Sequence, residues 1–441
     1  LKRMKKTQRG NWRGKGFFLA LLLFLTASGF PQMVFPTWDR TMGGSAQDTV
    51  RWLEVLPDGS MIAAGFSESR RDFLENAYTG EEFVALKLDA TGNLQWQKSF
   101  GGYRDDRAYV IKRTRDAEYL MAGSSISVGG DKSNSLGLWD AWIVKMGASG
   151  KLEWEKSFGG NDNDSIRDIV QTYDGGYVFV GFTHSKEIEG HHGQKDWLVG
   201  KIDFRGDLQW MKAFGGSGYD MAYSVVETKD KNLVITGYTF SRNGDLEGHD
   251  VQGNGDFWIL KLSQNADILW SKTYGGSGWD EPRCIRQTSD QGFILTGVTG
   301  SPDGDVKQNN GGWDIWLVKL DRNGNLQWEK TFGGSSHEKA FSVIENHRRE
   351  FLLAGYTASS DGDVSENHGG MDVWVLKVSR LGRLVWEKTF GTKENECAEI
   401  IVQMKNYSYT VAAGVFDGTP EIAGDDGRRY KDFWFFNFNA N

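Results

Sequence analysis

The sequence predicts an all-β protein, a seven-bladed β-propeller built from four-stranded antiparallel blades. A tryptophan-containing segment recurs every 56–60 residues. Each unit reads as four short strands without helical periodicity, and copies of the first and third strands number seven. A regular period of this size indicates one supersecondary unit repeated about an axis. The 57 glycines and only 6 prolines suit many tight turns between short strands.

The recurring segment is clearest at residues 326–334, Leu-Gln-Trp-Glu-Lys-Thr-Phe-Gly-Gly. Its alternation predicts an outermost fourth strand that packs Leu, Trp, Lys and Phe on one face. The glycine pair then leads to the next blade. The other copies, the first of which has Arg40 in place of lysine, begin at Trp38, Trp96, Trp154, Trp210, Trp270 and Trp386.

The remaining strands of one unit precede this segment. Residues 280–288 form a first strand, 293–299 a second and 314–320 a third. The second and third are apolar on both faces, as strands between stacked sheets should be. A long polar loop at 300–313 separates them. Four-stranded units that are apolar on both sides and repeated radially describe a propeller rather than a solenoid.

The ring is expected to close through the N-terminal part of the domain. The last unit ends with its third strand at 433–438 and lacks a fourth. A spare strand lies at 35–40. We expect this strand to complete the last blade, which removes the sheet edges of an open array. Residues 30–441 are therefore interpreted as a single domain.

Residues 1–29 have the order of a signal peptide. Seven Lys or Arg and no acid accompany an apolar run at 17–25, and small residues follow at 26–29. The run is short for a membrane span, although a retained anchor is the alternative. We expect an exported protein that is periplasmic, cell-surface or extracellular, with no transmembrane segment in the mature chain.

The net charge limits the classes of partner that the protein is expected to bind. The formal net charge is −8, and the chain without residues 1–29 is more acidic still. An acidic surface disfavours nucleic acid and anionic membranes. The two cysteines, Cys284 and Cys397, lie in equivalent strands of non-adjacent repeats and are interpreted as buried thiols.

The combined motifs resemble the secreted bacterial β-propeller repeat family. They are D-x-A at 220–222, D-G-G-Y at 174–177, D-I-W-L-V-K-L-D at 314–321 and the segment 324–334. The resemblance covers the whole mature chain. It implies an exported propeller, in a family mostly without assigned function.

A second resemblance is confined to Asp321, Gly324 and Trp328, which are similar to the tryptophan-docking motif of quinoprotein dehydrogenases. Those enzymes usually have eight blades and a vicinal cysteine pair. This chain has neither feature. The resemblance implies only the quinoprotein-like propeller superfamily.

Acids open the first and third strands of every unit. A ring of carboxylates could bind a cation, but an identical role in every unit favours architecture. The first-strand acids are expected to accept hydrogen bonds from the glycine-pair turn, or to pair with the lysine of the fourth strand. The third-strand acids are expected to bond the backbone of the long loop.

The long loops between second and third strands are the expected binding face, because loops on a rigid scaffold carry recognition. Two of them hold Asp-Gly-Asp elements, with Asp303, Asp305, Asp361 and Asp363 as candidate Ca²⁺ ligands. Ordinary turns are the favoured interpretation because the distal glutamate of a calcium loop is missing. No other cofactor and no catalytic residue is predicted, since no catalytic motif is present.

The favoured function is a non-catalytic binding or scaffold module for a protein or glycan partner at the cell surface. It predicts an evenly lined channel and unusual aromatics out on the loops, such as Tyr78, Trp139 and Trp313. The alternative is a carbohydrate-active enzyme, a hydrolase or lyase, with acids at the channel mouth. That alternative requires carboxylates in differing environments. A weaker alternative is a quinone-cofactor oxidoreductase.

Overall fold

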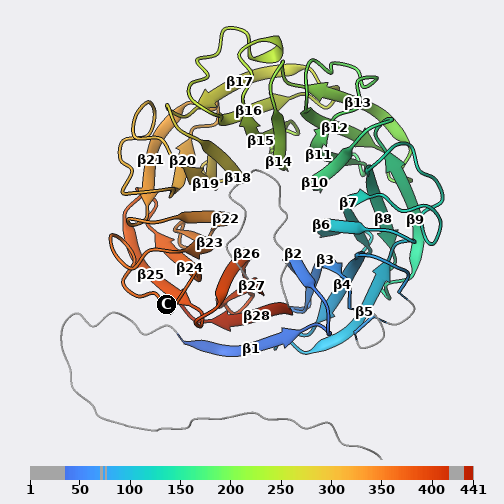
Figure 1. The fold of residues 1–441 in the computed structure, drawn as a ribbon, viewed down its shortest axis with the longest axis horizontal. Helices are drawn as coiled ribbons and strands as arrows, with labels where there is room; N and C mark the ends of the chain where they lie inside the picture. Colours follow the sequence, from blue (N-terminus) through green and yellow to red (C-terminus); the bar gives the residue numbers. More distant parts are fainter. Residues whose placement is uncertain (1–34, 70–72, 75–76, 417–431, 441) are drawn as a thin grey trace, which may run out of the picture. The chain divides into compact units, whose positions relative to one another are not determined.

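A computed structural model describes residues 35–69, 73–74, 77–416 and 432–440. Within this part, 28 strands form seven four-stranded antiparallel sheets. Figure 1 shows the sheets arranged as blades around one axis. The short 3₁₀ helix η1 (Gly244–Leu246) lies in one long loop. Among the described residues, no helix is long and apolar enough to cross a membrane. The predicted seven-bladed β-propeller is confirmed. The predicted signal peptide lies outside the described residues.

Each blade runs outward from the axis. The innermost strands of blades 1–7 are β2 (Asp48–Val55), β6 (Asp106–Arg113), β10 (Asp164–Gln171), β14 (Asp220–Glu227), β18 (Asp280–Gln287), β22 (Glu338–Glu345) and β26 (Asn395–Gln403). The second strands are β3 (Met61–Ser67), β7 (Tyr119–Ser125), β11 (Tyr177–Thr183), β15 (Leu233–Thr239), β19 (Phe293–Thr299), β23 (Phe351–Thr357) and β27 (Tyr409–Phe416).

The outer half of each blade consists of the third and fourth strands. The third strands are β4 (Glu82–Leu88), β8 (Asp140–Met146), β12 (Asp196–Ile202), β16 (Asp256–Leu262), β20 (Asp314–Leu320), β24 (Asp372–Val378) and β28 (Asp432–Phe438). The fourth strands are β5 (Leu94–Phe100), β9 (Leu152–Phe158), β13 (Leu208–Phe214), β17 (Ile268–Tyr274), β21 (Leu326–Phe332), β25 (Leu384–Phe390) and, in blade 7, β1 (Pro36–Met42).

Blade 7 joins the two ends of the propeller. Its sheet order is β1-β28-β27-β26, and β1 pairs antiparallel with β28 so that Thr41 lies opposite Trp434. Thr37 Oγ1 donates to the carbonyl oxygen of Asn437 at 3.2 Å. The predicted closure by the N-terminal strand is confirmed.

The core lies between neighbouring blades. The third strands of blades 2–6 each place a fully buried tryptophan there: Trp142, Trp197, Trp258, Trp316 and Trp374. Rings meet across the blade boundaries, as in the 4.1 Å centroid separation of Trp197 and Trp258 and the 4.7 Å separation of Phe83 and Trp142. Burial on both faces of the second and third strands, predicted from their apolar composition, is confirmed.

The fourth strand differs from the predicted pattern. Lys330 is exposed, whereas Glu329 on the opposite face is buried and accepts a hydrogen bond from Trp316 Nε1 at 3.1 Å. The pairing of fourth-strand lysines with first-strand acids is also wrong. Lys212, for example, pairs with the loop residue Glu189 at 2.8 Å. Loops of the same blade reach round the outer strand, so both of its faces are partly covered.

Every innermost strand carries a β-bulge at the residue after its D-x-A or equivalent segment. In blade 3 the register shifts between Ile166 and Asp168, which leaves Arg167 as the extra residue. The bulge brings the two strands so close that a Cβ on Gly181 would lie 1.9 Å from the carbonyl oxygen of Ser165. Glycine is therefore required opposite the bulge, and the bulged residue is turned toward the axis.

Interrupting β1 should weaken closure of the ring. We expect Arg40→Pro and Thr41→Pro, made as separate variants, to lower the unfolding midpoint. Proline bends the strand, and alternate residues direct their N–H groups to β28. At least one variant therefore also loses a ladder bond, and the carbonyl left without its donor costs ~1–3 kcal/mol. Arg40→Ala and Thr41→Ala are the controls, and thermal denaturation is the measurement. Midpoints equal to those of the alanine variants would show that β1 contributes little to closure.

Candidate functional site

The first-strand acids anchor the turns between blades. Asp220 accepts from the N–H of Gly216 at 2.9 Å and from Ser241 Oγ at 2.7 Å. The same glycine bond recurs, at 2.7–3.0 Å, for Asp48, Asp106, Asp164, Asp280 and Glu338. The predicted capping role is confirmed. These carboxylates hold the scaffold together.

The third-strand acids bond the long loops as predicted, since Asp256 accepts from the N–H of Gln252 at 2.9 Å and Asp314 from that of Asn310 at 2.7 Å. They also lie across the glycine linker from the next first-strand acid. Burial, followed by the charges of Asp280 and Asp305, raises the pKa of Asp256 to about 7. Burial raises the pKa of Asp280 and Asp314 to about 6.

The four candidate calcium ligands occupy equivalent turns in two blades. Asp303 accepts from the N–H of Ser277 at 2.7 Å and Asp305 from that of Gly275 at 3.2 Å. Asp361 and Asp363 make the matching bonds in the next blade, at 2.7 and 3.2 Å. No group of three His, Cys, Asp or Glu suited to a metal forms within the described residues. The calcium site stays a prediction, and the observed contacts are those of turn anchors.

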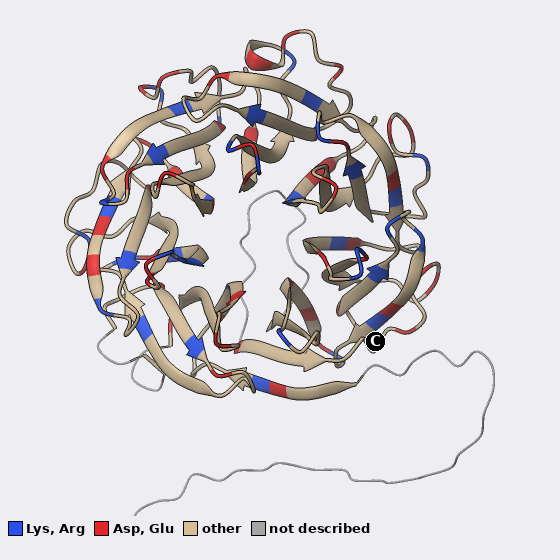
Figure 2. Ribbon diagram, turned by 180° about the vertical axis from the view of Figure 1, so that it is seen from behind, with Lys and Arg blue, Asp and Glu red and all other residues tan. Residues whose placement is uncertain are grey.

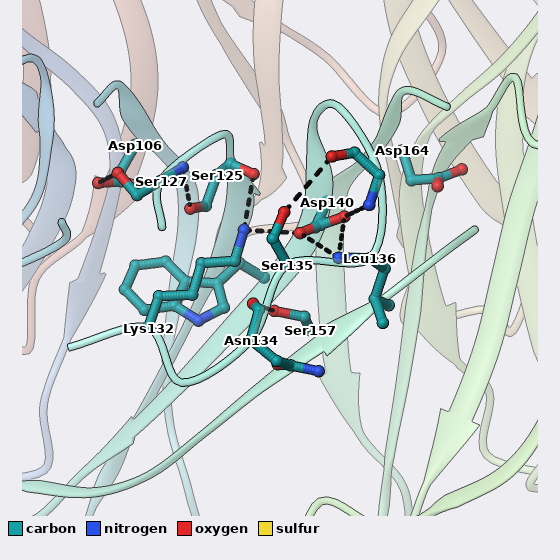
Figure 3. A network of polar contacts seen from close by, with 12 residues as sticks. Asp106, Ser125, Ser127, Lys132, Asn134, Ser135, Leu136, Asp140, Ser157 and Asp164 are labelled. Atoms are coloured by element: carbon teal, nitrogen blue, oxygen red, sulfur yellow. Dashed lines mark hydrogen bonds and ion pairs between the residues drawn. The ribbon is translucent and has the colours of Figure 1, made fainter. Parts of the chain in front are cut away.

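Blade 2 contains one departure from this scheme. Lys132 takes the place of the buried apolar residue Val306 of blade 5 and is itself fully buried. Its Nζ lies 2.7 Å from Asp140 Oδ2 and donates to the carbonyl oxygen of Ser125 at 3.0 Å (Figure 3). Asp140 also accepts from the N–H of Gly137 at 2.9 Å. The pair is a satisfied structural network.

The channel holds an uneven ring of side chains. A cavity of about 80 Å³, the channel cavity, is lined by Trp52 and the seven bulge residues. In blade order these are Arg51, Tyr109, Arg167, Tyr223, Arg283, Phe341 and Glu399. Arginine alternates with an aromatic residue until Glu399 interrupts the series. The prediction that a scaffold has an evenly lined channel is therefore wrong for this protein. The basic positions on the innermost strands can be followed in Figure 2.

The acids of the channel are held by cations. Glu399 Oε1 lies 2.8 Å from Arg51 Nη1. Glu281 lies 2.8 Å from both Arg283 Nη2 and Lys339 Nζ. Although burial acts to raise it, these two cations hold the pKa of Glu281 below its usual value. Both glutamates are therefore placed as ion-pair partners.

A larger pocket opens at one mouth of this channel. The mouth pocket, about 260 Å³, lies between blades 2 and 3 and shares Tyr109 and Arg167 with the channel cavity. Its lining residues come from β6, β7, β10, β11 and the loops at their ends: Arg107, Tyr109, Ser124, Trp139, Asn163, Ser165, Arg167, Phe182, His184 and Lys195. Trp139 and Lys195 each directly precede a third strand, so the pocket belongs to the long-loop face.

Cations and aromatic rings alternate within the mouth pocket. The Arg167 guanidinium lies 3.8 Å from the centre of the Tyr109 ring. The Lys195 ammonium lies 4.5 Å from the Phe182 ring, and the Arg107 guanidinium lies 5.0 Å from the Trp139 ring. Such contacts stabilise the cations and fix their positions. None of the described residues that line the pocket is a carboxylate.

One histidine completes the pocket in its neutral form. Burial, with a smaller effect of the neighbouring Lys195 ammonium, lowers the pKa of His184. Its Nδ1 lies 3.3 Å from the carbonyl oxygen of Asn163. The ring therefore adds a neutral polar edge to the lining.

Sequence reasoning missed most of the mouth pocket. Trp139 was singled out as a loop aromatic, whereas Arg107, Tyr109 and Arg167 were not. A signal was present: the second and fourth residues of each first strand vary among repeats while the first is always acidic. Strand alternation places those two positions on the channel side. Tyr78 and Trp313 do not line the pocket.

Comparisons with known proteins give information on the fold and none on the function. No family model and no curated protein matches the chain. Among solved structures, Kuenenia stuttgartiensis hydrazine synthase aligns over 84% of this chain and 95% of its own, with 10% identity and a TM-score of 0.49. A chain of the complex of Drosophila plexin A with semaphorin 1b aligns over 91% of this chain and 87% of its own, with 7% identity and a TM-score of 0.48. The Neurospora crassa Pan2 WD40 domain covers 92% and 97%, with 8% identity and a TM-score of 0.47. The structural neighbours are β-propeller proteins.

Asp256→Asn should stabilise the protein at alkaline pH. A carboxyl whose folded pKa is raised from 3.8 to about 7 contributes stability below pH 3.8 that is lost as the pH rises through 7. Asparagine stays neutral and can still accept the Gln252 bond. We expect the variant to be more stable at pH 8 by up to ~4 kcal/mol and equal to wild type near pH 4, measured by urea denaturation. A pH-independent difference would contradict the raised pKa.

Replacing Lys132 and replacing Asp140, the two partners of the buried pair, should lower the free energy of unfolding by different amounts. Lys132→Val reproduces the arrangement of blade 5, so we expect a loss of only ~1–2 kcal/mol. Asp140→Ala leaves a buried ammonium without its carboxylate, and we expect ~3–5 kcal/mol. Urea denaturation of both variants measures the difference. Equal losses would show that the pair contributes through volume alone.

Proposed function

We propose that this protein is an exported, non-catalytic binding module that recognises a glycan through the mouth pocket. The observation that carries the proposal is the pocket itself, in which three aromatic rings and several polar side chains converge on a space of about 260 Å³. A concave site with a few placed polar groups is the usual form of a ligand site.

The chemistry of the lining favours a sugar. The Tyr109, Trp139 and Phe182 rings offer flat apolar surfaces for the C–H face of a pyranose. Ser124, Ser165 and Asn163 offer hydroxyl and amide groups to sugar hydroxyls. A peptide partner on the same loop face is the less specific fit, because the site is a pocket of single-ring size.

The hydrolase alternative lacks support in this site. Glycoside hydrolysis generally uses two carboxyl groups flanking the scissile bond. Among the described residues, no carboxyl group lines the mouth pocket. The carboxyl group that lines the channel cavity, that of Glu399, is paired with Arg51. Binding without turnover is therefore the better account.

Export and a place at the cell surface, in the periplasm or outside the cell are part of the proposal. They rest on the basic and apolar composition of residues 1–29. The motif resemblance to secreted bacterial propeller repeats supports the same interpretation.

Replacing the pocket tryptophan should weaken recognition. On a glycan array followed by calorimetry, we expect Trp139→Ala to weaken binding of any captured glycan by at least ~10-fold. Trp313→Ala is the matched control, because Trp313 precedes β20 as Trp139 precedes β8 but lies outside the pocket. The same glycans are assayed chromatographically for products. Equal losses in both variants would refute the site, and released products would refute the non-catalytic function.

A further inference from the structure

The repeat places a pair of aromatic rings beside the mouth pocket. Asn163 directly precedes β10 and His184 directly follows β11, and both line the pocket. One blade further on, the same two positions hold Tyr219 and Phe240. In both places the N–H of the later residue donates to the carbonyl oxygen of the earlier one, at 2.9 Å and 3.1 Å respectively. The Tyr219–Phe240 pair therefore has the same backbone setting between blades 3 and 4 as two pocket residues have between blades 2 and 3.

The Tyr219–Phe240 pair adjoins the mouth pocket. Lys195, which lines the pocket, forms a parallel β-bridge with Tyr219. Its ammonium lies 4.5 Å from the centre of the Phe182 ring, which also lines the pocket, and 6.0 Å from the centre of the Tyr219 ring, which does not. The two rings are therefore neighbours on the long-loop face, one inside the pocket and one at its edge.

Both rings of the pair offer surface to a ligand. Tyr219 is 45% exposed. Phe240 is half-buried, and the Tyr238 and Trp279 rings meet it edge to face, at centroid separations of 5.5 and 5.2 Å. Blade 4 has Gly255 directly before its third strand, where blades 2 and 3 have large side chains of the mouth pocket. A Cβ on Gly255 would lie 3.3 Å from the Phe240 ring, so glycine leaves that part of the ring without a covering side chain.

The surroundings of the mouth pocket favour one direction for a longer ligand. Toward the axis lies the channel cavity, whose volume of about 80 Å³ suits a few water molecules of roughly 30 Å³ each. A sugar ring does not fit there. On the blade 1 side, Glu81 directly precedes β4 and Asp105 directly precedes β6. On the blade 4 side, the equivalent positions are Lys195 and Tyr219. Among these described positions, an aromatic ring follows only toward blade 4.

We propose that the glycan is an oligosaccharide, with one sugar ring in the mouth pocket and the next ring stacked on Tyr219 and in contact with Phe240. This inference rests on the proposed function and adds a second subsite and its direction. The tyrosine ring offers a flat apolar face, and its hydroxyl can bond sugar hydroxyls at the edge. Because neighbouring rings already fix Phe240, little side-chain freedom is lost on binding there.

The test compares ligands of increasing length. Calorimetry is carried out with cello-, malto-, xylo-, manno- and chito-oligosaccharides of one, two and three rings, and with fragments of any other glycan that the array captures. For the series that binds, we expect at least ~10-fold higher affinity with two rings than with one. Tyr219→Ala should remove this gain and leave the affinity for one ring within ~3-fold. Tyr219→Phe retains the ring and should retain the gain.

Further variants keep the result interpretable. Tyr173→Ala is the matched control, because Tyr173 is 52% exposed but lies in the turn between β10 and β11, at the other end of blade 3. It should leave every affinity unchanged. Trp139→Ala should weaken short and long ligands alike, since both occupy the mouth pocket. Phe240→Leu removes a flat ring while keeping an apolar side chain, and it serves if the melting curve shows that Tyr219→Ala does not fold.

The outcomes separate the two proposals. Equal affinities for one, two and three rings overturn the second subsite and leave the glycan function standing. A gain with length that Tyr219→Ala leaves intact, or that Tyr173→Ala removes equally, has the same consequence. If no oligosaccharide binds and the array captures no glycan, the proposed function fails and the second subsite fails with it.

Discussion

The acid at the start of each innermost strand is the interaction on which the ring depends. Its carboxylate lies beside the linker from the preceding blade and accepts from a glycine N–H, as Asp280 does from Gly276 at 2.9 Å. A second bond, from Ser301 Oγ to Asp280 at 2.6 Å, ties the same carboxylate to the end of the second strand. Linker, inner strand and loop are thus fixed together in blades 1–6. The loops that surround the mouth pocket begin from these fixed points.

This anchoring has an electrostatic cost that the protein tolerates. At each linker a third-strand acid and a first-strand acid approach the same glycine: a Cβ on Gly275 would lie 2.5 Å from Asp256 and 2.9 Å from Asp280. Burial and mutual repulsion favour the protonated forms. In blade 2, a lysine placed at an apolar position compensates the charge of Asp140. Such variation among repeats changes local charge without changing the fold.

The fold could be predicted from the sequence because its determinants repeat. The opening acids and the strand alternation recur seven times and the glycine pair six times, and together these local signals predict strand number, order and closure. The burial of Glu329 and exposure of Lys330 could not be predicted, because they depend on how loops cover the outer strand. The mouth pocket was missed for a related reason. Arg107 and Trp139 come from blade 2 and Lys195 from blade 3, and only the three-dimensional register of the two blades brings them together.

The alternation of arginine and aromatic residues around the channel cannot be complete, because the number of blades is odd. Two kinds of residue can alternate without interruption only around an even number of blades, and this ring has seven. The interruption lies in blade 7, where Glu399 separates Phe341 from Arg51 and pairs with the latter at 2.8 Å. Arg283 has an acidic partner too, Glu281 at 2.8 Å, so blade 7 differs from the other blades in the kind of residue at its bulge. The near-symmetric scaffold thus has one distinct blade, and the seven rotational settings of a ligand on its axis are not equivalent.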